Sequence, residues 1–182
     1  DMTAAQVRQA MLSAIACAND AIRQEAARNA EYQHMGTTLV CAVARSDMAI
    51  IGNIGDSRAY HITPEGIFQI SRDHSVVENM VAKGDLTPLE ARTHPNRNLI
   101  TRALGPDIHA KADTFELPWH KDEFLLLCSD GLVNTVSDQE MLFEVLHDGD
   151  VNECLDHLLQ ISLQRGAPDN ITAVLLLNGE GR

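Results

Sequence analysis

Apolar residues recur every three or four positions over residues 3–28, which predicts one long amphipathic helix. Val7, Met11 and Ile15 belong to the apolar side of this helix. Thr3 is a suitable N-cap, because its side chain can accept a hydrogen bond from the first helical turn. A helix of this length needs a large surface to bury its apolar side, so we expect it to lie along a sheet.

Short runs rich in apolar and β-branched residues follow the helix and predict strands. The predicted strands cover residues 39–44, 48–54, 59–62, 67–70, 112–117, 123–128 and 171–177. A polar link at residues 45–47 makes the first two strands an antiparallel hairpin, and a turn at residues 63–66 joins the next two. We therefore expect residues 48–70 to continue as a meander.

A polar stretch at residues 72–105 interrupts the strands and carries predicted helices at 76–83 and 88–93. Two later helices are expected from residue 137 and over residues 151–165, with a break at 148–150. Because an excursion of this length between strands is functional more often than passive, we expect the polar stretch to serve the site. The pattern predicts one α+β domain over residues 1–177, followed by a tail at 178–182.

The apolar run at residues 124–128 ends abruptly in Ser129, Asp130 and Gly131. This pattern predicts a buried strand that brings one carboxylate to the edge of a sheet, with Gly131 allowing a sharp turn. A carboxylate held at such a place needs a partner, and a cation is a suitable one. The alternative is that Asp130 only caps the helical segment that follows.

Asp56 and Asp169 share the context of Asp130, because each stands beside an apolar run and next to small or turn-forming residues. Mg²⁺ and Mn²⁺ prefer carboxylate oxygens, and three acids far apart in sequence can converge if their strands are neighbours. Each acid taken alone is also an ordinary turn residue. Only the combination of the three acids indicates a metal site.

Composition narrows the classes of function. The chain has 182 residues, of which 14 are basic and 26 acidic, and the formal net charge of −12 disfavours binding to nucleic acid. No apolar run reaches the length of a membrane helix, so we expect no membrane partner. The four cysteines are far apart and form no zinc pattern, which predicts reduced thiols and a cytoplasmic location.

Five short blocks resemble, in order and spacing, the signature blocks of the PP2C or PPM family of metal-dependent protein serine/threonine phosphatases, in the compact form of bacterial members. The blocks are Gly36-Thr37-Thr38, Gly55-Asp56-Ser57-Arg58, Asp73-His74-Ser75, Ser129-Asp130-Gly131-Leu132 and Pro168-Asp169-Asn170-Ile171-Thr172. The resemblance implies a sandwich of two antiparallel sheets flanked by helices, in an α-β-β-α arrangement.

The resemblance also implies a site that holds Mn²⁺ or Mg²⁺, with two catalytic ions and a third ion common in bacterial members. Asp130 and Asp169 match carboxylates of the catalytic pair and would act through a water that the ions activate. Asp56 matches the acid that holds the third ion together with Asp130. Residues 76–104 correspond to the flap beside the site, and Asn98 stands where some relatives have a serine.

The family's N-terminal blocks, an Arg, an Asn-Glu-Asp and an Asp-Gly-x-Gly-Gly-His, have no match before the first helix. We therefore expect that the N-terminal strands of the domain are missing from this chain, and that the 182 residues alone are inactive or nearly so. The alternative is a non-catalytic regulatory domain that binds a partner. The retention of Asp56, Asp130 and Asp169 argues against that alternative.

The expected partners are phosphorylated proteins, including a serine/threonine kinase and its targets, and the expected state is a monomer. Four residues keep two interpretations, a structural or surface role and a contact with substrate: His74, His94, Arg97 and Arg102. Ser57 and Ser129 lack the context of a catalytic nucleophile, so serine hydrolase chemistry is not expected.

Overall fold

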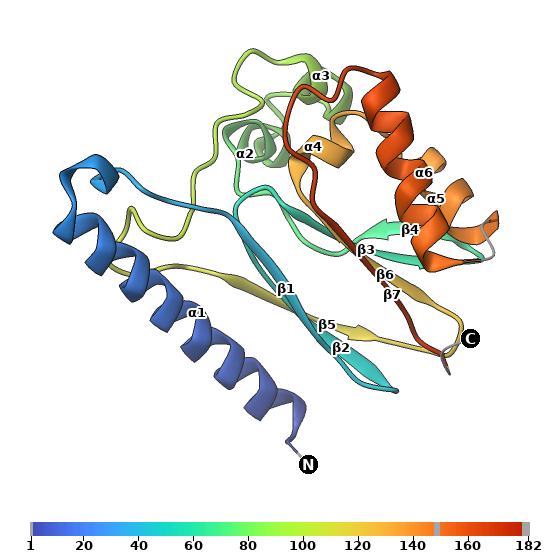
Figure 1. Ribbon diagram of the computed structural model, residues 1–182, viewed down its shortest axis with the longest axis horizontal. Helices are drawn as coiled ribbons and strands as arrows, with labels where there is room; N and C mark the ends of the chain where they lie inside the picture. Colours follow the sequence, from blue (N-terminus) through green and yellow to red (C-terminus); the bar gives the residue numbers. More distant parts are fainter. Residues whose placement is uncertain (1, 148–149, 180–182) are drawn as a thin grey trace. The chain divides into compact units, whose positions relative to one another are not determined.

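Two antiparallel β-sheets and a set of helices form the protein, as the computed structural model shows for residues 2–147 and 150–179 (Figure 1). The helices are α1 (Ala4–Arg28), the 3₁₀ helix η1 (Ala30–Tyr32), α2 (Val76–Lys83), α3 (Pro88–Thr93), α4 (Asp130–Val133), α5 (Asp138–His147) and α6 (Val151–Gln164). The strands are β1 (Leu39–Ala44), β2 (Met48–Ile54), β3 (Arg58–Thr63), β4 (Gly66–Gln69), β5 (Asp113–Pro118), β6 (Phe124–Cys128) and β7 (Ala173–Leu177). The predicted fold class is confirmed.

The strands form one sheet in the order β1-β2-β5 and a second in the order β4-β3-β6-β7. The expected meander is wrong at one point, because β2 and β3 belong to different sheets. Strand β3 pairs with β6, with Tyr60 opposite Leu126, and both side chains are fully buried. The apolar run of β6 is therefore paired with a strand far earlier in the chain. The short link between β2 and β3 suggests that these two strands are neighbours and does not indicate this pairing.

The chain divides into two compact units. The first contains Asp1–Cys41, Gly52–Asp56 and Arg72–Thr114, and the second contains Ala42–Ile51, Ser57–Ser71 and Phe115–Arg182. The expectation of one domain over residues 1–177 stays a prediction.

In the first unit, helix α1 begins with the predicted cap. The Thr3 side chain accepts from the Gln6 N–H at 3.3 Å, and the Gln6 side chain accepts from the Thr3 N–H at 2.8 Å. Met11 and Ile15 are buried, and a Cβ at Gly52 of β2 would lie 2.7 Å from the Met11 sulfur. The helix thus packs closely against a strand, as its apolar side predicts.

Asn19 fastens α1 to the loop at residues 105–108 of the same unit. Its side-chain oxygen accepts from the Gly105 N–H at 2.7 Å, and its amide donates to the carbonyls of Asp107 and Ile108 at 3.0 and 3.3 Å. Asn19 is 1% exposed, so these bonds satisfy a buried amide on both sides.

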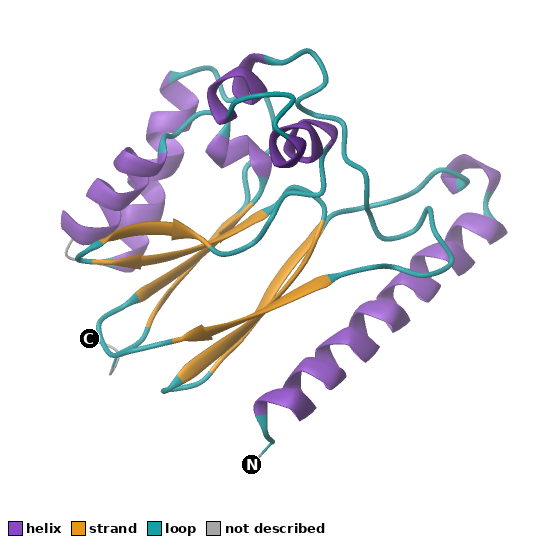
Figure 2. Ribbon diagram, turned by 180° about the vertical axis from the view of Figure 1, so that it is seen from behind, coloured by secondary structure: helices purple, strands orange, loops and turns teal. Residues whose placement is uncertain are grey.

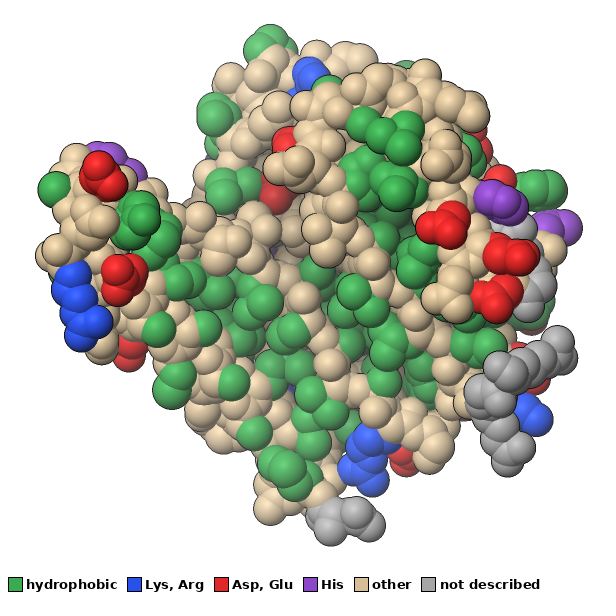
Figure 3. Space-filling model, in the orientation of Figure 1, with side chains coloured by type: hydrophobic (Ala, Val, Ile, Leu, Met, Phe, Trp, Pro, Cys, Tyr) green, Lys and Arg blue, Asp and Glu red, His purple; other side chains and the backbone are tan. Residues whose placement is uncertain are grey.

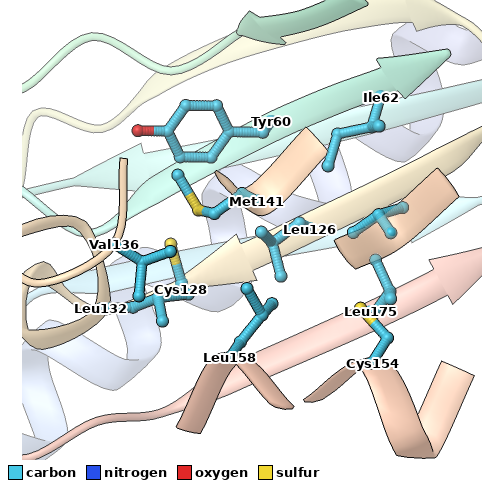
Figure 4. Close-up of a cluster of buried hydrophobic side chains, with 11 residues drawn as sticks. Tyr60, Ile62, Leu126, Cys128, Leu132, Val136, Met141, Cys154, Leu158 and Leu175 are labelled. Carbon is cyan, nitrogen blue, oxygen red and sulfur yellow. The ribbon is translucent and has the colours of Figure 1, made fainter. Parts of the chain in front are cut away.

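In the second unit, α5 and α6 cover one face of the four-stranded sheet (Figure 2). Side chains from β3, β6, β7 and these helices form one apolar core (Figure 4). The core residues are Tyr60, Ile62, Leu126, Cys128, Leu132, Val136, Met141, Val145, Cys154, Leu158 and Leu175. This core holds the end of β6, where the candidate site begins.

The predicted helix break at residues 148–150 and the predicted tail at 178–182 extend beyond the residues that the structure describes. At the described edge of the break, the Asp150 side chain accepts from the Asn152 N–H at 2.6 Å and caps α6. Within the described chain, no helix is both long enough and apolar enough to cross a membrane.

Candidate active site

Asp130 follows the end of β6 and is the first residue of α4. Ser129 occupies the N-cap position of this short helix, so the alternative that Asp130 is the cap is wrong. Because the cap position is one residue earlier, the Asp130 carboxylate is left for another role. The Ser129 side chain makes no capping bond either, which leaves it free to bind another segment.

Ser129 binds the segment that follows Asp169. The Ser129 N–H donates to the Thr172 carbonyl at 2.9 Å, and the Ser129 hydroxyl oxygen accepts from the Thr172 N–H at 3.0 Å. The same hydroxyl donates to the Asn170 carbonyl at 3.3 Å. These bonds fasten the two acid-bearing segments of the second unit to each other, so Ser129 has a positioning role and not that of a nucleophile.

Gly131 is required by the close approach of the same two segments. A Cβ at this position would lie 2.3 Å from the Asn170 carbonyl oxygen and 3.0 Å from the Asn170 carbonyl carbon. The prediction that Gly131 permits a sharp turn is therefore wrong, because Gly131 is in α4 and does not have a positive φ. Its missing side chain lets backbone meet backbone.

Electrostatic repulsion acts between the two carboxylates of this site. Burial, followed by the negative charge of Asp169, raises the pKa of Asp130 above its usual value. Backbone hydrogen bonds and the charge of Arg58 act in the opposite direction but do not cancel the effect. Asp169 is exposed, and its carboxylate accepts from the Asn170 N–H at 2.7 Å. A cation between the two acids would relieve their repulsion.

The two carboxylates are the right kind of ligand for a hard divalent ion, but they are too few to complete its coordination. Asp130 and Asp169 offer the carboxylate oxygens that Mg²⁺ and Mn²⁺ prefer. In residues 2–147 and 150–179, however, no three side chains of His, Cys, Asp or Glu gather as a metal site. The pair can supply part of a coordination shell, and a complete shell needs additional oxygen ligands.

Asp56 belongs to the first unit, where it is partly buried after the end of β2. The preceding residue, Gly55, has φ +107°, and a Cβ there would lie 2.3 Å from the Thr38 methyl carbon. Gly55 is also bonded to His74, which is only 5% exposed. The structural interpretation of His74 is thereby supported.

Asp113, at the start of β5, is a site residue that the sequence did not single out. Its carboxylate bonds to His74 Nε2 at 3.0 Å and accepts from Arg102 Nη1 at 3.0 Å. The only sequence signal for Asp113 was an acid at the beginning of a strand. Arg102, expected on the solvated surface or at the substrate, is engaged with this carboxylate.

The predicted flap contains α2 and α3, whose bounds match the expected helices. Asn98 lies exposed in the turn after α3, and the His94 ring accepts from the Asn96 N–H at 3.1 Å. The structure gives Arg97 no side-chain role, so a substrate contact by Arg97 stays a prediction.

The visible face of the protein carries a small group of acidic side chains. Figure 3 shows them together with histidines over α5 and α6. This distribution agrees with the net charge of −12.

Comparisons with known proteins extend the resemblance over almost the whole chain. The sequence profile described as Protein phosphatase 2C matches residues 1–175. The serine/threonine phosphatase stp of Listeria innocua is 33% identical over 96% of this chain and 69% of its own length. The serine/threonine protein phosphatase PstP of Mycobacterium tuberculosis is 35% identical over 90% of this chain, which spans 31% of that protein.

Solved structures show the same fold. The crystal structure of the serine/threonine phosphatase Stp1 from Staphylococcus aureus matches with a TM-score of 0.92 and 38% identity, over 97% of this chain and 70% of that one. The chain belongs to the PP2C family of protein serine/threonine phosphatases, which are metal-dependent hydrolases of phosphate esters.

Proposed function

We propose that Asp130 and Asp169 hold Mn²⁺ or Mg²⁺ for the hydrolysis of phosphoserine and phosphothreonine in proteins. The observation that carries this proposal is the pair itself. Ser129 holds together two segments whose acids are 39 residues apart in numbering, and burial together with the negative charge of Asp169 raises the pKa of Asp130. A structure that holds two like charges together favours a cation as their partner.

Bound ions of this kind lower the pKa of a water and turn it into a nucleophile for phosphorus. Asp130 has a raised pKa, so binding a cation displaces any proton that its carboxylate carries. The Asn170 N–H holds one oxygen of Asp169 and thereby orients the carboxylate. Ser129 and Gly131 keep the segments of the two acids at a constant separation.

Asp56 is proposed as a further ligand, for the third ion of bacterial members. Its support is the matching block Gly55-Asp56-Ser57-Arg58 and the tight backbone around Gly55. The proposed cofactors are therefore two catalytic ions and a third ion.

The proposed substrates are phosphorylated proteins, including a serine/threonine kinase and its targets, and the proposed state is a cytoplasmic monomer. The relatives' names support the substrate class, since those of Listeria and Mycobacterium are serine/threonine phosphatases. A non-catalytic regulatory domain is not favoured, because the related proteins are named as enzymes and the three acids are retained.

The test is phosphate release from a phosphothreonine peptide by the protein expressed from its complete reading frame. Release should require Mn²⁺ or Mg²⁺, stop with a chelator and return when Mn²⁺ is added back. Asp156→Asn is the matched control, since Asp156 is an exposed acid on α6, and it should keep full activity. Undiminished release in the presence of the chelator would contradict the proposal. The expectation that the 182 residues alone are inactive or nearly so stays a prediction.

A further inference from the structure

His74 holds the backbone of Gly55 through two hydrogen bonds. The backbone N–H of His74 donates to the Gly55 carbonyl at 2.8 Å, and the Gly55 N–H donates to Nδ1 of the His74 ring at 3.1 Å. Gly55 is the residue before Asp56, and its φ of +107° makes it the bend at which the chain leaves β2. His74 therefore binds both backbone polar groups of Gly55, the carbonyl through its own backbone and the N–H through its ring.

The hydrogen-bond pattern determines the tautomer of His74. A backbone N–H is only a donor, so Nδ1 must be the acceptor and Nε2 carries the hydrogen of the neutral ring. Nε2 then donates to the Asp113 carboxylate at 3.0 Å. Arg102 donates to the other oxygen of Asp113 at 3.0 Å, and its Nη1 lies 3.2 Å from Nε2. Two donors thus converge on one carboxylate, which fixes the ring in one orientation.

Asn53 supports the same bend from the strand side. It is fully buried, and its amide donates to the carbonyls of Arg72 and Gly55 at 3.1 and 3.4 Å. The bend is held by groups from β2 and from the segment before α2, and the start of β5 holds the His74 ring. A turn on the surface can satisfy its backbone groups with water, so this many protein hydrogen bonds to the single residue Gly55 exceed what a passive turn requires.

We propose that His74 is a positioning residue, which sets the backbone of Gly55 and thereby the direction of the Asp56 carboxylate toward its ion. The inference rests on the proposed function, in which Asp56 is a metal ligand. Its physical basis is that metal ligands must be held within a fraction of an ångström, and neighbouring groups that do not touch the ion provide this restraint.

Two substitutions separate positioning from packing. His74→Asn keeps an acceptor oxygen near the place of Nδ1, so it retains the bond from Gly55 and loses the bond to Asp113. His74→Gln places its amide farther out, near the place of Nε2, and loses the bond from Gly55. His61→Gln is the matched control, because His61 also bonds to a carboxylate, that of Glu123 at 2.8 Å, in the second unit.

The measurement is the Mn²⁺ titration of the protein from its complete reading frame, followed by broadening of the amide signals of Asp56 and Asp130. His74→Gln should weaken Mn²⁺ binding at Asp56 by about 10-fold to 100-fold, the range for groups that orient metal ligands. It should also speed hydrogen exchange of the Gly55 N–H. His74→Asn and His61→Gln should stay within about threefold of the parent protein on the same scale.

Parent-like binding at Asp56 in His74→Gln overturns the inference, and so does an equal loss in His74→Asn and His74→Gln, which would indicate packing alone. If His74→Gln does not fold, Asp113→Asn replaces it, because that carboxylate is partly exposed. Asp113→Asn should abolish the single His74 tautomer that the ring nitrogen signals report, and it should weaken Mn²⁺ binding at Asp56. If both the tautomer and the Mn²⁺ affinity are unchanged, the inference is overturned. Absence of Mn²⁺ from every acid of the parent protein overturns the proposed function instead.

Discussion

Gly131→Ala is the substitution that most directly tests how the acid-bearing segments are held together. The added Cβ would lie 2.3 Å from the Asn170 carbonyl oxygen, and both groups belong to backbone that cannot rotate away. Gly131 does not have a positive φ, so the substitution introduces no conformational strain of the left-handed kind. Its effect is therefore purely steric.

The magnitude follows from the distance. The segments must separate by about 1 Å to restore ordinary contact between carbon and oxygen. Forcing an additional methyl group into a packed site costs roughly 1–3 kcal/mol of folding free energy. Asn170 adjoins Asp169, so a shift of this size also changes the separation of Asp169 from Asp130, and a displacement of about 1 Å lowers the rate roughly 100-fold.

The assays are urea unfolding, which gives the free energy of unfolding, and phosphate release from a phosphothreonine peptide. Gly179→Ala is the control, since a Cβ there meets no atom closer than 3.6 Å. The control should stay within about 0.5 kcal/mol of the parent protein. Parent-like stability and rate in Gly131→Ala would refute the argument that this glycine sets the spacing of the acids.

Three further predictions concern stability. Asn19→Leu should lower the free energy of unfolding by about 2–4 kcal/mol in urea, because it leaves buried backbone groups without partners. Asp130→Asn should raise the thermal midpoint in metal-free buffer above pH 3.8. Burial and the charge of Asp169 raise the pKa of Asp130 in the folded protein, so the parent protein loses stability as pH rises from 3.8 through that raised pKa. Glu123→Gln should have the opposite pH dependence. Burial alone would raise the pKa of Glu123, but hydrogen bonds from His120 and His61 hold that pKa below its usual 4.5. The ionised Glu123 therefore stabilises the fold above pH 4.5, and this stabilisation is lost as pH falls through the lowered pKa. For both acids, a variant whose stability changes with pH in the same way as that of the parent protein would contradict the predicted direction of the pH dependence.

Local signals determined what could be predicted from the sequence. The bounds of α2 and α3 agree with the predicted helices because their ends have strong signals, Ser75 and Gly84 for α2 and Thr87 with Pro88 for α3. These signals act within a few residues, so neighbouring positions in the sequence are sufficient to show them.

Long-range contacts could not be predicted in the same way. The pairing of β3 with β6 and the bond between His74 and Asp113 join residues that are far apart in the sequence. Gly131 carried a clear signal, but the sequence does not show whether a glycine serves a turn or the approach of another segment. The acids themselves were identified from the sequence, whereas the groups that position them were found only in the fold.

The most direct test of a metal site shared by Asp130 and Asp169 is a double-mutant cycle on phosphate release with Mn²⁺, using the protein from its complete reading frame. If Asp130 and Asp169 hold a shared set of ions, each of Asp130→Asn and Asp169→Asn should remove most of the activity, on the order of 1,000-fold. The double variant should then be no slower than the single variants, because the function is already lost. Losses that multiply in the double variant, or single variants that retain the parent rate, would contradict a shared metal site.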